Sequence, residues 1–372
     1  MLAEISRMMK TRFTQWFFPR DHEKEHFRAL DGLRGLAILL VVLSHTSNAG
    51  LFFHPLLDFH GTGKIGVFLF FMLSAYLLDR QIAQRFRAEK AGSHYWKNYF
   101  LRRFLRIYPL FLLALISWWM LNETGYFKVI SSLQEIADHL LLLRGENVFW
   151  SVPVEFKYYF LSPILMWFFH RFLRWKLQKI IMVISLLVAV SVALDVLLGL
   201  SEISTLKYLS VFLCGTLLSI YELVQQDKLR NNRSSALLEA LGVLFALMIV
   251  LSFPTVSEAF SLPFPPPDAP GFYLFYAILW ALVLLAAKHG KGLLRFLLQL
   301  RIMRFLGVIS FSLYLFHMPV ISIIQRSAIP NPVKVYTIWI ISLAIASFTY
   351  LTVERPLSRI RLKRRAANPV NR

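Results

Sequence analysis

The sequence is poor in cysteine and in acidic side chains. Its single cysteine, Cys214, excludes a disulfide framework and any metal site built from several thiolates. Charged residues make up only 17% of the 372 residues, whereas a soluble domain contains about 25%. The motifs G-x-S-x-G and G-x-x-x-x-G-K-[ST] are also absent. These absences leave no support for an ordinary serine hydrolase or an ATP-driven transporter, and we predict no metal site.

Apolar residues, in contrast, are abundant and gather in long runs. Hydrophobic residues make up 57% of the chain and aromatic residues 15%, which excludes a disordered chain. A helix that crosses a bilayer needs about 20 mostly apolar residues. The sequence therefore predicts an all-α, polytopic integral membrane protein with about ten transmembrane helices, near residues 30–49, 65–84, 104–121, 156–173, 179–198, 206–224, 235–252, 272–289, 304–324 and 335–353.

Basic residues predict how these helices are oriented. The chain carries 41 Lys and Arg against 21 Asp and Glu, a formal net charge of +20. Segments rich and poor in basic residues alternate between the spans, which places 33 basic residues on one side and seven on the other. An excess of Lys and Arg marks the cytoplasmic side. We therefore predict a multi-pass protein of the inner (plasma) membrane with a cytoplasmic N-terminal segment 1–29, a membrane domain 30–354 and a basic cytoplasmic tail 355–372.

The same alternation explains the positive charge without a nucleic acid partner. Basic residues that flank spans on the cytoplasmic side form a solvated face next to anionic lipid. The partner that this pattern indicates is the lipid bilayer.

The first predicted span contains ionisable residues that are rare inside a bilayer. Asp31 and Arg34 are one helical turn apart and are able to pair. Arg34 and His45 are eleven residues apart, roughly 16 Å along a helix and close to three turns, so both project from nearly the same face. This arrangement suits an anionic ligand that enters from the cytoplasm and a proton transfer further out. The alternatives are a snorkelling Arg34 and a His45 that only hydrogen-bonds between helices.

Two later spans carry charged residues at their ends. Arg102, Arg103 and Arg106 cluster at the cytoplasmic start of the third span, where guanidinium groups either bind phosphate or simply anchor the helix. Glu155 lies at the outer edge of the fourth span, where a carboxylate either serves a site or is solvated.

A second histidine occurs in the ninth span. His317 is predicted to lie past the midplane, at a depth similar to that of His45. Pro319 follows it and frees the backbone carbonyl of Leu315, four residues earlier. Two histidines at matched depth in separate helices favour a shared site.

Six short motifs occur in order along the predicted spans. They are R-x-x-D-x-x-R-G-x-A followed by a histidine, G-V-x-x-F-F-x-L-S, R-R-x-x-R-I-x-P, W-S-x-x-x-E-x-x-x-Y, S-x-x-x-Y-x-x-H-x-P and E-x-P. Together they resemble the acyltransferase 3 family, the bacterial integral-membrane O-acyltransferases of surface polysaccharides and related acceptors. The residues that carry the resemblance are Arg28, Asp31, Arg34, Gly35, Ala37, His45, Gly66, Val67, Phe70, Phe71, Leu73, Ser74, Arg102, Arg103, Arg106, Ile107, Pro109, Trp150, Ser151, Glu155, Tyr159, Ser310, Tyr314, His317, Pro319, Glu354 and Pro356.

The resemblance implies transfer of an acyl group, usually acetyl, from cytoplasmic acyl-CoA to a hydroxyl of a carbohydrate or lipid-linked glycan. On this basis we predict His45 as the general base, with Glu155 and His317 as the other catalytic residues. The donor's phosphates are predicted to bind Arg34, Arg102, Arg103 and Arg106. Supporting roles fall to Asp31, Ser74, Tyr314 and Glu354.

Alternative readings of the same residues remain. An acyl-histidine intermediate is a second chemical route beside general base catalysis. A transporter or exporter of a small acid or glycan, without acyl transfer, is the alternative function. The residues do not specify the acceptor, the acyl chain, the oligomeric state or a partner protein.

Overall fold

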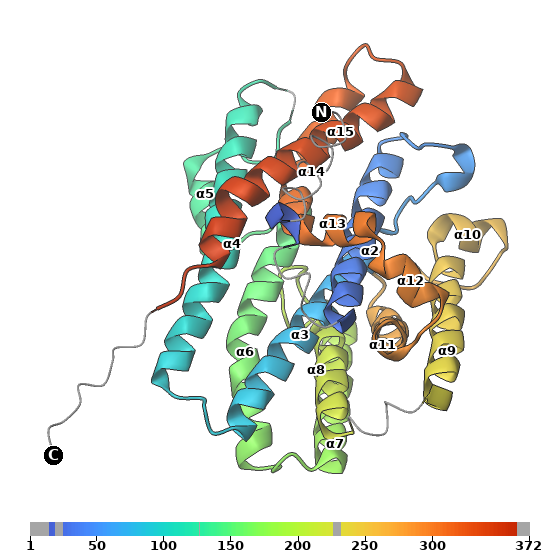
Figure 1. Ribbon diagram of the computed structural model, residues 1–372. Helices are drawn as coiled ribbons and strands as arrows, with labels where there is room; N and C mark the ends of the chain where they lie inside the picture. The colour runs from blue at the N-terminus through green and yellow to red at the C-terminus, as the bar shows by residue number, and fades with distance from the viewer. Residues whose placement is uncertain (1–14, 19–24, 126, 226–231, 363–372) are drawn as a thin grey trace, which may run out of the picture.

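The computed structural model describes residues 15–18, 25–125, 127–225 and 232–362, and within these ranges the regular structure is entirely helical. Most of the predicted segment 1–29, and the predicted tail from residue 363 onward, lie outside the described residues. Each predicted span coincides with helical structure (Figure 1). The helices concerned are α2 (Glu25–Asn48), α3 (Gly63–Arg87), α4 (Ser93–Asn122), α6 (Ser151–Arg171), α7 (Leu177–Leu198), α8 (Leu209–Val224), α9 (Asn232–Leu251), α11 (Tyr273–His289), α13 (Arg301–Val308), α14 (Ser310–Gln325) and α15 (Asn331–Thr349).

Shorter elements connect these helices. They are η1 (Pro55–Leu57), α5 (Leu133–Leu140), η2 (Asn147–Trp150), α10 (Pro254–Ala259), α12 (Leu293–Gln299), the π-helical turn η4 (Tyr350–Glu354) and α16 (Arg355–Ser358). In Figure 1, α3, α6, α7 and α8 lie side by side, whereas α12 and α13 run across α2.

In the described part of the chain, five stretches of helix are long and apolar enough to cross a membrane. They are Arg28–Asn48, α3, α4, α7 and the run Asn331–Ser358. Two bent pairs, α11 with α12 and α13 with α14, raise the number to seven if each pair is one span. The all-α prediction is confirmed, and the helices are consistent with a multi-pass membrane protein. Ten spans and cytoplasmic termini stay predictions.

The predicted continuous span 304–324 is interrupted in the structure. Helices α13 and α14 meet at Ile309 with a bend of 79°. The cause is tertiary packing, because the backbone of α13 lies directly against that of α2. A Cβ atom on Gly307 would lie 1.8 Å from the carbonyl oxygen of Asp31, and one on Gly35 would lie 1.9 Å from that of Met303. Only glycine permits such an approach.

The carbonyl that Pro319 frees has a partner from another helix. Trp118 of α4 is fully buried and donates its indole N–H to the carbonyl oxygen of Leu315 at 3.1 Å. A backbone group freed in an apolar environment needs such a replacement. This bond fixes α14, which carries His317, against α4.

A buried ion network joins α3, α8 and α11. The carboxylate of Glu222 accepts hydrogen bonds from Tyr76 at 2.7 Å, from Arg80 at 2.5 Å and from the ammonium group of Lys288. Its second oxygen lies 3.0 Å from a ring nitrogen of His289. A buried carboxylate requires this degree of pairing, since leaving it alone costs several kcal/mol.

Candidate active site

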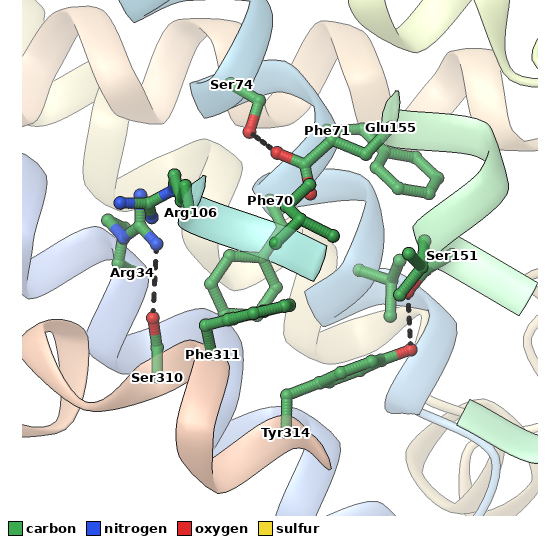
Figure 2. Close-up of a pocket in the computed structure, with 13 residues that line it drawn as sticks. Arg34, Phe70, Phe71, Ser74, Arg106, Ser151, Glu155, Ser310, Phe311 and Tyr314 are labelled. Atoms are coloured by element: carbon green, nitrogen blue, oxygen red, sulfur yellow. Dashed lines mark hydrogen bonds between the residues drawn. The ribbon is translucent and has the colours of Figure 1, made fainter. Parts of the chain in front are cut away.

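Five helices, α2, α3, α4, α6 and α14, line a cavity of about 40 Å³, which we name the arginine cavity (Figure 2). Two cations and one carboxylate project into it from different helices. Aromatic and aliphatic side chains form most of the remaining wall. The lining residues are Arg34, Val67, Phe70, Phe71, Ser74, Arg106, Ile107, Ser151, Val152, Glu155, Ser310, Phe311 and Tyr314.

The cations of the arginine cavity are Arg34 and Arg106. Their guanidinium groups come together at one end of the cavity in Figure 2, and Arg106 is the charge that acts most strongly on Arg34. Arg34 donates to the hydroxyl of Ser310 at 3.3 Å and lies 6.0 Å from the centre of the Phe70 ring. Among the described residues, no carboxylate lies within ion-pair distance of either arginine. Two like charges are thus held together facing a cavity, an arrangement that suits an anionic ligand.

Glu155 lies in the arginine cavity and not beside His45. Its carboxylate accepts hydrogen bonds from Ser74 and, at 2.7 Å, from the hydroxyl of Tyr159. It also interacts electrostatically with both Arg34 and Arg106. The structure therefore brings Glu155 and Ser74 together with the arginines.

The other two predicted arginines do not line the arginine cavity. Arg102 donates to the carbonyl oxygen of Asn98 at 3.2 Å, within its own helix. Arg103 lies over the rings of Tyr99 and Tyr159, 5.9 and 5.5 Å from their centres. Helical spacing alone did not separate Arg106 from these two neighbours.

Asp31 and Glu354 do not line the arginine cavity but interact with its arginines. Both carboxylates interact electrostatically with Arg34, and Glu354 also with Arg106. Glu354 is buried and accepts a hydrogen bond from Ser312 of α14 at 3.0 Å. The supporting roles predicted for Asp31 and Glu354 stay predictions.

The two histidines predicted at similar depth are in contact. Nδ1 of His45 lies 2.7 Å from Nε2 of His317, and their rings are 5.0 Å apart at an angle of 14°. His317 is fully buried, and its Nδ1 lies 3.0 Å from the carbonyl oxygen of Leu313 and 2.9 Å from that of Tyr314.

These contacts assign the hydrogens of the two neutral rings. A carbonyl oxygen only accepts, so Nδ1 of His317 carries the hydrogen and its Nε2 has the lone pair. Nδ1 of His45 then donates to that lone pair. The remaining nitrogen, Nε2 of His45, is left unprotonated and is able to accept a proton.

His45 lines a second and larger cavity of about 1040 Å³, which we name the histidine cavity. Loops between α2 and α3, before α6, between α7 and α8 and around α10 contribute to its walls. Its polar and charged lining residues are Ser44, His45, Asn48, His60, Lys64, Asn147, Glu202, Glu258, Asp268, Tyr314, Ser322 and Gln325.

Lys64 closes one wall of the histidine cavity by bridging two loops. Its ammonium group lies 3.2 Å from Glu202 and 3.1 Å from Asp268. Burial opposes ionisation of Glu202, but hydrogen bonds from Tyr208 and Lys207 and the charge of Lys64 lower its pKa to about 2. Sequence reasoning missed this bridge, although Lys64 is the one basic residue of segment 50–64.

Among the residues that the structure describes, two side chains, Val67 and Tyr314, line both cavities. Val67 is 5% exposed. Tyr314 donates to the carbonyl oxygen of Val148 at 2.6 Å and accepts from the hydroxyl of Ser151 at 2.9 Å. These two side chains separate the arginine cavity from the histidine cavity as a single layer, which we name the partition.

Comparison with known proteins gives the family. The family model described as an acyltransferase domain matches residues 27–353. The peptidoglycan O-acetyltransferase OatA of Listeria monocytogenes is 23% identical over 372 residues, which cover 91% of this chain and 57% of that protein. The O-acetyltransferase OatA of Staphylococcus aureus is 24% identical over 391 residues, covering 94% and 59%. The chain therefore spans under three fifths of the length of these relatives.

No solved structure matches the chain. The family match extends from the start of α2 to the π-helical turn η4 and so includes every residue of both cavities. The family predicted from the six motifs is confirmed: the chain belongs to the acyltransferase 3 family.

Proposed function

We propose that this chain is a membrane O-acyltransferase that moves an acyl group, most simply acetyl, from cytoplasmic acyl-CoA to a hydroxyl of a cell-surface or exported carbohydrate. The observation that carries this proposal is the pairing of two cavities across one layer of side chains. One cavity holds two arginines without ion-pair partners among the described residues, and the other holds a histidine pair.

The donor occupies the arginine cavity in this proposal. Arg34 and Arg106 match its phosphate groups, because guanidinium groups bind phosphate oxygens through charge-assisted hydrogen bonds. The aromatic wall formed by Phe70, Phe71 and Phe311 accommodates the less polar pantetheine arm. The thioester then lies at the partition, next to Val67 and Tyr314.

The acceptor approaches through the histidine cavity. The loops around this cavity belong to segments poor in Lys and Arg, which we predict to be extracytoplasmic. Its polar wall suits a carbohydrate or a lipid-linked glycan, and one relative is named a peptidoglycan O-acetyltransferase. The exposed apolar faces of the helices would contact the bilayer.

The chemistry follows from the hydrogen positions on the two rings. The acceptor oxygen attacks the thioester carbonyl carbon while its hydroxyl proton passes to Nε2 of His45. His317 accepts from the opposite ring nitrogen of His45 and so holds the reactive tautomer. The carbon–sulfur bond then breaks, and the departing thiolate takes the proton from His45. The products are an ester and free coenzyme A.

Inverted membrane vesicles with radiolabelled acetyl-CoA test this function. We expect label to enter a glycan or lipid fraction with the wild type and to be lost in His45→Ala. The matched control is His54→Ala, a histidine in the loop that follows α2 and that lines neither cavity. Equal labelling with His45→Ala and the wild type would refute the role of His45.

The same vesicles separate acyl transfer from transport. A transporter of a small acid or glycan needs no acyl-CoA and makes no acylated product. Movement of a labelled acid or glycan that proceeds without acyl-CoA, together with no transfer of label from any acyl-CoA, would contradict the proposed activity.

A further inference from the structure

A buried hydroxyl beside His45 has no hydrogen-bond partner. Ser44 is 1% exposed, lies in α2 and lines the histidine cavity, yet its Oγ makes no hydrogen bond in the structure. A serine inside a helix normally donates to a carbonyl one turn earlier, as Thr46 does to Val42 at 3.1 Å. Most buried polar groups are bonded, and an unbonded one needs an explanation.

The position of this hydroxyl is defined by Gly63 at the start of α3. A Cβ atom on Gly63 would lie 3.3 Å from Oγ of Ser44 and 3.7 Å from Nε2 of His45. The free hydroxyl and the unprotonated ring nitrogen therefore face the same small space. Glycine at position 63 keeps that space open on the side of α3.

We propose that Ser44 is a further catalytic residue, whose hydroxyl donates a hydrogen bond to the thioester carbonyl oxygen as that oxygen becomes negative. This inference rests on the proposed function. It names the group that stabilises the oxyanion, which the histidine pair does not do because Nε2 of His45 has no hydrogen to donate before it receives the acceptor proton.

The acceptor oxygen bonds to the carbonyl carbon, its proton goes to Nε2 of His45, and the carbonyl electron pair moves onto oxygen. Ser44 donates to this oxyanion. When the carbonyl re-forms, the carbon–sulfur bond breaks and the thiolate takes the proton back from His45. The hydroxyl of Ser44 is unchanged at the end, and it makes its bond only when substrate is present.

Replacement of Ser44 by alanine tests the proposal with acetyl-CoA as the probe. Loss of one oxyanion donor lowers kcat by about 100- to 1,000-fold, and we expect this fall with the KM for acetyl-CoA nearly unchanged. Ser44→Thr retains the hydroxyl and should recover much of the rate. The matched control is Ser219→Ala, a buried helical serine that bonds the carbonyl oxygen of Thr216 and lies outside both cavities.

Stability separates this role from a structural one. Because the hydroxyl of Ser44 has no partner to lose, Ser44→Ala should leave the thermal midpoint equal to or above that of the wild type. A lower midpoint with proportional loss of activity would mean that Ser44 only supports the fold, and would overturn the proposal.

The kinetic constants of Ser44→Ala distinguish an oxyanion role from the other roles that Ser44 could have. If Ser44→Ala retains wild-type kcat while His45→Ala is inactive, the proposed function stands and the role of Ser44 is wrong. If Ser44→Ala raises only the KM for the acceptor, Ser44 binds the acceptor and not the oxyanion. If the wild type transfers no label at all, the proposed function fails and the role of Ser44 fails with it.

Discussion

Replacing the arginines one at a time should show which of them bind the donor. Four arginines fit a phosphate-binding role in the sequence, but only Arg34 and Arg106 line the arginine cavity. We therefore expect Arg106→Gln and Arg34→Gln to weaken acetyl-CoA binding, whereas Arg102→Gln should have little effect. Glutamine keeps hydrogen-bonding capacity and removes the charge, which isolates the electrostatic contribution.

The magnitude follows from what each arginine contacts. Arg34 makes one hydrogen bond to the neutral Ser310, and no carboxylate of the described residues lies within 4 Å of either guanidinium group. Their charge is thus available to the ligand. A hydrogen bond to a charged group contributes about 1.5–3 kcal/mol, which corresponds to roughly 10- to 140-fold in the dissociation constant.

Calorimetric titration of purified protein with acetyl-CoA measures this change, and thermal unfolding of each variant controls for folding. Because the interaction is ionic, the difference between wild type and Arg106→Gln should shrink as salt is raised. An Arg102→Gln protein that loses as much affinity as Arg106→Gln would refute the assignment of the donor to the arginine cavity. Unchanged affinity in Arg34→Gln and Arg106→Gln would refute it too.

Three further predictions concern the buried ion network, the loop bridge and the partition. Lys288→Met should destabilise the protein by about 3–5 kcal/mol, because it removes one partner of the buried Glu222; Arg80 and His289 remain and favour the lower figure, and an unchanged thermal midpoint would contradict this. The pKa of Glu202 is lowered from 4.5 to about 2. Its bridge to Lys64 therefore stabilises the fold fully at any pH above about 4.5, and this stabilisation is lost only as the pH falls toward about 2. The contribution of Glu202 to the wild-type midpoint should therefore be the same at pH 7 and at pH 5, so Glu202→Gln should lower the midpoint equally at both; a difference between Glu202→Gln and wild type that disappears at pH 5 would contradict the lowered pKa. Val67→Trp should lower acetyl transfer at least about tenfold with donor affinity retained, since the bulkier side chain displaces the thioester from His45; full activity in vesicles would show that the acyl group does not pass this side chain.

The sequence predicts the helices well because their signal is local. Apolar runs of about 20 residues and the alternation of basic segments need no knowledge of tertiary contacts. The bend at Ile309 gives no such signal, because neither Val308 nor Ser310 interrupts a helix. It arises where Gly307 meets the carbonyl of Asp31 in α2, a contact between residues far apart in the chain.

Some features of the candidate site could likewise be predicted from the sequence, whereas others depend on tertiary contacts. Matched depth in two helices was enough to suggest that His45 and His317 share a site, and the structure places them in contact. Depth does not fix rotation about the helix axis, however. It therefore did not separate Arg106 from Arg102, nor place Glu155 with the arginines instead of the histidines.

The roles of Ser44, Val67 and Lys64 could not be predicted from the sequence for a related reason. A serine, a valine and a lysine are common near span ends and carry no signal of their own. Ser44 becomes notable only because its hydroxyl is buried without a partner beside His45. Val67 becomes notable only because it separates two cavities.

The central claim is that a donor on the cytoplasmic side and an acceptor on the opposite side meet at His45. Vesicles of opposite orientation test it most directly, because acetyl-CoA does not cross a bilayer. Radiolabelled acetyl-CoA added outside should label the glycan or lipid fraction in inverted vesicles that contain the wild type or His54→Ala, and should give none with His45→Ala or in right-side-out vesicles. Labelling of right-side-out vesicles, or labelling that survives His45→Ala, would contradict the account.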